Sequence, residues 1–186
     1  QPPTPKGDLN KLLNELGIAW NTERTVFDTV NPHPQFANVV QPDLVFVTNR
    51  EGEPAPFSEE SDVSSGLQEV LLLWPGSIQP REGSSAKFIP LIRSAKTSTG
   101  TIAFNELLQN NPFFGPQFLP NPVRIIDTMT DYYLAARITS DAGKGLNVIF
   151  VADVDIISNM FFQIRERQMY DLNLDNVTFV LKAVDK

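Results

Sequence analysis

The sequence predicts an α/β layered fold with a mixed sheet, and two observations favour this class. Short apolar runs suited to strands recur along the chain, and two segments with helical spacing follow the last of these runs. The runs at 70–74 and 148–152 are apolar at every position, which is typical of strands covered on both faces. We therefore expect a single α/β domain over residues 1–186, with helices covering the sheet.

The first predicted element is a short amphipathic helix. Asp8 can cap its first turn, and Gly17 supplies the left-handed conformation that often ends a helix. The apolar residues recur at intervals of three and four, at Leu9, Leu12, Leu13 and Leu16. Residues 1–6 hold three prolines, whose fixed φ favours an extended leader before this helix.

Six further segments have the length and composition of strands, and prolines, glycines or polar loops separate them. They are 25–28, 43–48, 70–74, 88–92, 132–139 and 148–152. The last is the most apolar run, so we expect it to be a central strand with both faces covered. Two helices are predicted after it, over 158–166 and 173–184.

Residues 104–122 carry four prolines and a Phe113-Phe114-Gly115 turn. This composition predicts an irregular connection with one helical turn at 105–109. Phe113, Phe114 and Phe118 lie in this polar, proline-rich setting, so they can form an exposed apolar patch.

Charge and composition exclude several classes of function. Fifteen Lys and Arg against twenty-two Asp and Glu give a net charge of −7, which disfavours binding to nucleic acid or to an anionic membrane surface. Without cysteine, the chain has no disulfide, thiolate metal site or cysteine nucleophile. The longest apolar run is far shorter than the roughly 20 residues of a membrane span, so any anchor lies outside this chain.

Motifs of common enzymes are also absent. The sequence contains no Gly-x-Ser-x-Gly elbow, no Walker loop and no Gly-x-Gly-x-x-Gly fingerprint. His33 is the only histidine and lies between two prolines, where a packed acid partner is not expected. We therefore expect no catalytic residue, no metal site and no cofactor.

Asp153 and Asp155 follow the last predicted strand and precede a helix, where α/β proteins commonly bind ligands. One interpretation is a Mg²⁺ or Ca²⁺ site. The favoured alternative is that Asp155 caps the helix while Asp153 accepts hydrogen bonds from backbone N–H groups. If a ligand binds here, the expected polar contacts are Asp153, Asp155, Ser158 and Asn159, with Ser65, Ser77 and Ser94 on the same rim.

Four stretches together resemble the gliding-motility-type ABC transporter auxiliary proteins, an uncharacterised transport-system family. They are 7–18 with 26–28; 65–67 leading to 73–78; 90–94; and 148–155 with Ser158, Asn159, Phe161, Phe162 and the segment 176–184. The resemblance implies the extracytoplasmic (periplasmic) domain of a membrane-anchored protein beside an ABC permease and ATPase. It also implies a Rossmann-like or flavodoxin-like fold with a mainly parallel sheet, incomplete at its N-terminus.

Three hypotheses follow from these observations. The first is a non-enzymatic domain that recognises a ligand, such as a glycan, or an envelope partner. The second is a structural module that docks onto permease subunits through the aromatic patch. The third is a divalent-metal-dependent hydrolase that uses Asp153 and Asp155.

Overall fold

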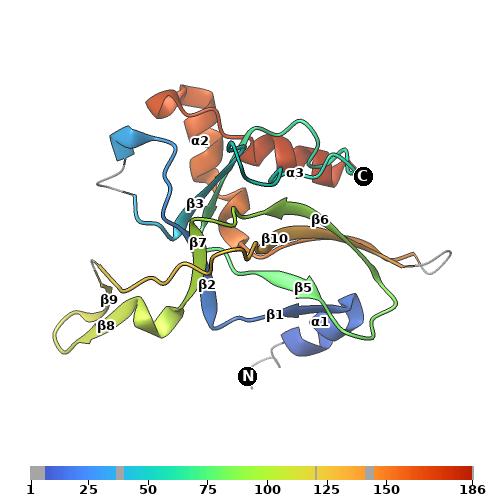
Figure 1. Cartoon of the computed structure of the whole chain (residues 1–186), viewed down its shortest axis with the longest axis horizontal. Coiled ribbons are helices and arrows are strands. Elements are labelled where there is room, and N and C mark those ends of the chain that lie inside the picture. Colours follow the sequence, from blue (N-terminus) through green and yellow to red (C-terminus); the bar gives the residue numbers. More distant parts are fainter. Residues whose placement is uncertain (1–6, 37–39, 120, 141–144, 186) are drawn as a thin grey trace, which may run out of the picture.

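The computed structural model describes residues 7–36, 40–119, 121–140 and 145–185 (Figure 1), so the predicted leader at 1–6 lies outside the described residues. The elements are α1 Leu9–Leu16, β1 Ile18–Trp20, β2 Arg24–Asp28, η1 Pro34–Phe36, β3 Leu44–Thr48, β4 Glu69–Leu73, β5 Ile78–Pro80, β6 Lys87–Arg93, β7 Thr99–Ala103, η2 Phe104–Glu106, β8 Leu108–Asn111, β9 Gly115–Phe118, β10 Tyr133–Thr139, β11 Asn147–Val151, η3 Val154–Ile157, α2 Asn159–Arg167, η4 Met169–Asp171 and α3 Asn176–Val184.

The strands form one larger sheet and three two-stranded sheets. The larger sheet has the order β1-β5-β10-β11, and β6 pairs with β10 as well. The other pairs are β2 with β7, β3 with β4, and β8 with β9. Every strand pairing in the described residues is antiparallel.

The predicted α/β fold with a mainly parallel, Rossmann-like or flavodoxin-like sheet is therefore wrong. Parallel neighbours need a long crossover, usually a helix, between consecutive strands. Here α1 precedes the first strand and both α2 and α3 follow the last one, while only 3₁₀ turns occur between β1 and β11 in the part described. Strands joined in this way can pair antiparallel, but the described residues between them supply no helix for a crossover.

Several local predictions are confirmed. The Asp8 carboxylate caps α1 by accepting from the Lys11 N–H, and Gly17 ends the helix at φ 68°. The six predicted strand segments appear as β2, β3, β4, β6, β10 and β11, and the two late helices as α2 and α3. Leu13 and Leu16 are the buried residues of α1.

Other predictions failed. Strand β11 is not central: it ends the strand order, and its backbone pairs with β10. Residues 104–122, expected to be irregular, contain η2 and the β8–β9 hairpin. The predicted turn at 105–109 corresponds to η2, which covers Phe104–Glu106. The short strands β1, β5 and β7 were not predicted, since runs of three to five residues give little periodic signal.

The strand pair β3–β4 is buried on both faces. Val45, Val47, Val70 and Leu72 pack into one apolar cluster, where Phe179 of α3 joins them. Phe46 and Leu71, whose side chains alternate with these, pack into a second cluster with residues of α2 and α3. A third cluster joins α1 to the face of the larger sheet that carries Ile138 and Phe150. The double-sided burial predicted from the run at 70–74 is thus confirmed.

Candidate functional site

Asp153 is a structural residue in this fold. It lies two residues after the end of β11 and is 7% exposed. One carboxylate oxygen accepts from the Leu73 N–H at 2.7 Å and the other from the Asp155 N–H at 2.8 Å. Burial raises the pKa of Asp153 to about 6 against the opposing effect of these two N–H donors. The expectation that Asp153 bonds backbone N–H groups is confirmed.

The neighbouring site candidates have different roles. Asp155 and Asn159 are exposed, and Ser158 is half-buried. The cap of α2 is Ser158, which accepts from the Met160 N–H, so the expected capping by Asp155 is wrong. No group of three or more His, Cys, Asp or Glu side chains that could hold a metal occurs in the described residues.

The three serines lie in different surroundings. The hydroxyl of Ser65 donates to Glu59, and its carbonyl oxygen accepts from Lys182 of α3 at 2.7 Å. Ser94 is buried, and its hydroxyl oxygen accepts from the Tyr132 N–H at 3.0 Å. Ser77 lines a cavity of about 220 Å³, which Tyr132 also lines. Ser77 and Ser94 thus each lie near Tyr132, one at the cavity and the other at its backbone N–H, while Ser65 lies beside α3. Ligand binding by the seven predicted residues stays a prediction.

Both tryptophans contribute to packing. Trp20 meets Phe150 edge to face at 5.9 Å, and it lies so close to Gly76 that a Cβ there would be 2.2 Å from its Nε1. Trp74 stacks on Phe118 with ring centroids 5.4 Å apart. These contacts give both tryptophans a packing role.

The most prominent surface feature is the β8–β9 hairpin, which projects from the body of the molecule at the lower left of Figure 1. Asn111 pairs with Gly115, and the Asn111 side chain accepts from the backbone N–H groups of Phe113 and Phe114. Gly115, the first residue of β9, adopts φ 74°, a left-handed conformation that glycine takes without steric cost. This turn holds Phe113 and Phe114 at the tip, where they are 88% and 77% exposed.

The base of the hairpin is fixed to the core by aromatic packing. Phe118 stacks on Trp74, and Phe104 meets the Phe118 ring edge to face at 6.4 Å. Leu107 is buried in a cluster with Phe27 and Ile102, against which Trp74 packs. The hairpin therefore projects from the core with its strands paired and its base packed.

The chain that returns from the hairpin is also anchored. Arg124 forms a buried ion pair with Asp43, and the Asp127 N–H donates to the Thr99 carbonyl oxygen at 2.9 Å. Gly100 permits this passage, because a Cβ there would lie 2.3 Å from the backbone oxygen of Ile125. Several apolar side chains of the returning segment are nevertheless exposed, namely Val123, Ile125 and Met129.

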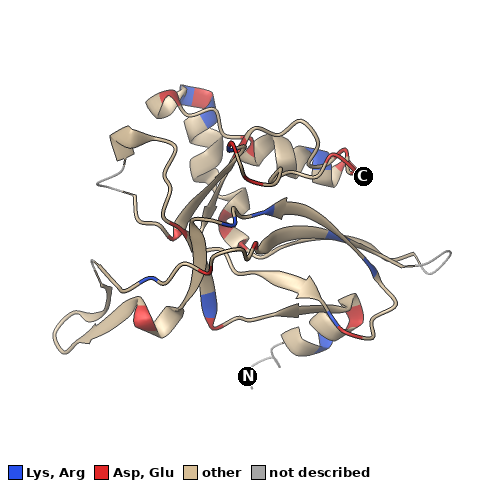
Figure 2. Ribbon diagram, in the orientation of Figure 1, with Lys and Arg blue, Asp and Glu red and all other residues tan. Residues whose placement is uncertain are grey.

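We give the name aromatic arm to the exposed apolar residues of the hairpin, its base and the returning segment: Phe104, Phe113, Phe114 and Phe118 with Val123 and Ile125. The exposure predicted for Phe113, Phe114 and Phe118 is confirmed. The sequence reasoning missed Val123 and Ile125, although apolar residues just after a proline-rich stretch were a usable signal. Figure 2 shows that the hairpin carries no charged residue, and residues 107–119 contain none in the sequence.

None of the helices in the described parts of the chain is long and apolar enough to cross a membrane. A search of curated proteins found no match, and a search of solved structures found none either. The family model described as "ABC-type uncharacterized transport system" matches residues 1–183. That match covers nearly the whole length and agrees with the resemblance carried by the four sequence stretches. The chain therefore belongs to the family of ABC-type uncharacterized transport system proteins.

Proposed function

We propose that this chain is a non-enzymatic, extracytoplasmic auxiliary domain of an ABC-type transport system, which docks onto a permease subunit through the aromatic arm. Family membership supports the association with ABC transport. The observation that carries the docking role is the exposure of Phe113 and Phe114 at the tip of a hairpin whose base is packed.

The energetics favour a protein partner. Burying a phenylalanine side chain stabilises a complex by roughly 1.5–3 kcal/mol, so the two tip residues can supply about 3–6 kcal/mol. A micromolar complex requires about 8 kcal/mol, and a few aromatic residues commonly provide most of it. An anionic membrane surface fits less well, since residues 104–122 contain no Lys or Arg to attract lipid headgroups.

Co-purification and a measurement of affinity for the permease test this function. The chain would be co-expressed with the permease and ATPase subunits of its own transport system, and the affinity for the purified permease would be measured by biolayer interferometry. We expect the double substitution Phe113→Ser and Phe114→Ser to weaken binding at least tenfold.

The matched control replaces two exposed apolar residues elsewhere, Leu9→Ser and Leu12→Ser on α1. This control should bind the permease like the wild type. Equal binding by the two double variants, or no binding by the wild-type chain, would contradict the proposal.

A further inference from the structure

The outer edge of β11 presents backbone groups that no described residue satisfies. The Ala152 N–H donates to the Leu134 oxygen and the Ser140 N–H to the Leu146 oxygen, which fixes the hydrogen-bonded pairs along β10 and β11. Because antiparallel pairs alternate, the N–H and C=O groups of Asn147, Ile149 and Val151 point away from β10. Within the described residues, no hydrogen bond reaches these outward groups.

An apolar groove lies beside this edge. It has a volume of about 330 Å³ and separates β11 from α3 and η3. It is lined by Asn147, Ile149 and Val151 of β11, by Ile156 of η3, and by residues of α3 that include Phe179 and Val180. Val148 and Phe150 alternate with the strand residues of the groove and pack on the opposite face, with α1. Asn147, Ile149 and Val151 therefore carry the outward backbone groups and also line the groove.

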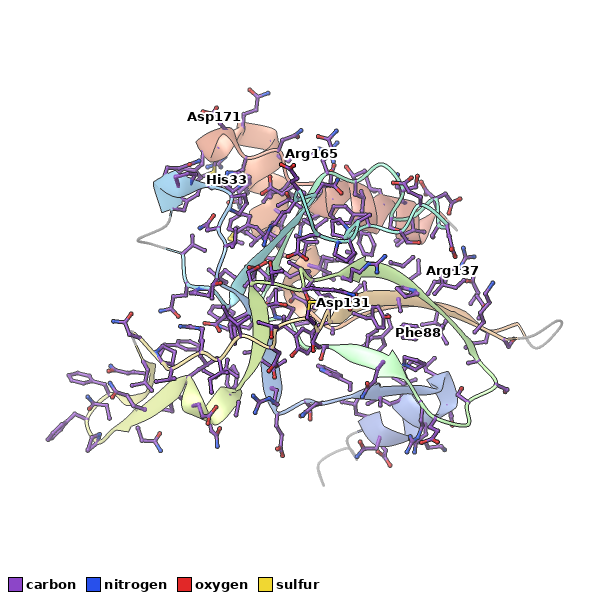
Figure 3. All side chains as sticks on the ribbon, viewed as in Figure 1. His33, Phe88, Asp131, Arg137, Arg165 and Asp171 are labelled. Atoms are coloured by element: carbon purple, nitrogen blue, oxygen red, sulfur yellow. The ribbon has the colours of Figure 1, made fainter. Side chains whose placement is uncertain are left out.

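One end of the groove is cationic. Arg137 of β10 lies directly across from Ile149, so its side chain is on the groove face of the sheet. Its Nε donates to the Asn147 side chain at 2.8 Å, so the guanidinium lies beside β11. Figure 3 labels Arg137 among the side chains. Among the described residues, no carboxylate pairs with Arg137, in a chain whose net charge is −7.

We propose that this edge binds an extended peptide segment of a partner protein, which adds to the sheet antiparallel to β11. Peptide residues opposite Val151 and Ile149 would place apolar side chains over the groove. The residue opposite Asn147 would place an acidic side chain beside Arg137, because carboxylates pair well with guanidinium groups. The preferred sequence is then apolar-x-apolar-x-acidic from its N-terminus to its C-terminus.

Charge complementarity favours this occupant over a second copy of the chain. Two copies paired through β11 about a twofold axis at Ile149 would place Val151 of one copy opposite Asn147 of the other. Arg137 would then face an apolar side chain instead of an acid. The groove is distinct from the aromatic arm, so the two proposals can fail independently.

The probes are two acetylated, amidated peptides, Val-Thr-Ile-Thr-Glu and the same peptide with Lys in place of Glu. Binding would be followed by amide chemical shifts of the isotopically labelled full chain. We expect saturable shifts at Asn147, Ile149 and Val151 with the acidic peptide, and at least tenfold weaker binding of the Lys peptide. Arg137→Gln should remove this preference, whereas Arg165→Gln, a substitution on α2, should preserve it.

Ile149→Pro provides a second test, because it removes an outward N–H without removing a bond to β10. With its circular dichroism spectrum unchanged, this variant should bind the acidic peptide at least tenfold more weakly. Absence of shifts at the three residues up to millimolar peptide, or equal binding of both peptides, would overturn the proposal. So would a wild-type dimer in sedimentation that Ile149→Pro converts to a monomer, since the edge would then belong to a second copy.

Discussion

The ion pair between Asp43 and Arg124 is a strong test of how this fold is held together. Asp43 is 0% exposed, and the Arg124 Nε donates to its Oδ1 at 3.2 Å while Nη2 bonds to Oδ2. In Arg124→Met, the alkyl part of the side chain is kept but the carboxylate stays buried without its cation. Removing one partner of a buried pair costs about 3–5 kcal/mol, which is a large part of the 5–15 kcal/mol typical of whole domains.

Urea denaturation followed by circular dichroism measures this loss. With a slope of about 2 kcal/mol per molar urea, a loss of about 4 kcal/mol lowers the midpoint by about 2 M. The control is Lys96→Met. Lys96 pairs with Asp131 at 3.6 Å and its side chain is 33% exposed, so its loss should cost under about 1 kcal/mol.

A double-mutant cycle with Asp43→Asn separates the pairwise contribution from other effects of each substitution. We expect the double variant Asp43→Asn and Arg124→Met to be more stable than the sum of the single losses indicates, with a coupling of about 2 kcal/mol. Equal midpoint shifts for Arg124→Met and Lys96→Met, or a coupling near zero, would refute the argument from burial.

Three further outcomes are expected. Burial raises the pKa of Asp153 from 3.8 to about 6, so its contribution to stability is fully present below about pH 4 and is lost as pH rises through 6. Urea denaturation at a series of pH values should show the free energy of unfolding fall by about 3 kcal/mol across that window. Asp153→Asn should remove this fall, and a variant with the same pH profile as the wild type would contradict the assignment. Gly100→Ala should lower the free energy of unfolding by about 1–3 kcal/mol because its Cβ meets the Ile125 backbone, while Gly7→Ala, with open space around it, should leave the thermal midpoint unchanged. Asp8→Ala should cost about 1 kcal/mol through the lost cap of α1, and an unchanged denaturation midpoint would argue against that cap.

The candidate sites were only partly predictable. Three clustered phenylalanines in a proline-rich segment predicted an apolar patch, because their neighbours could not supply a core. The rim around Asp153 was predicted because parallel α/β sheets commonly bind ligands at the carboxyl ends of their strands. That rule does not apply to an antiparallel fold. The edge of β11 could not be predicted, since a fully apolar run has the same composition in a central strand as in an edge strand beside a groove.

Local chemistry determined the elements: a capping aspartate, a terminal glycine and apolar spacing specified α1, and six apolar segments specified most of the longer strands. These signals act between residues a few positions apart, so the sequence displays them directly. Strand pairing was decided only in three dimensions, where Thr25 meets Ile102 and Val45 meets Leu72. Such partners are chosen by packing over the whole core, which also decides which strand edge and which aromatic side chains remain exposed.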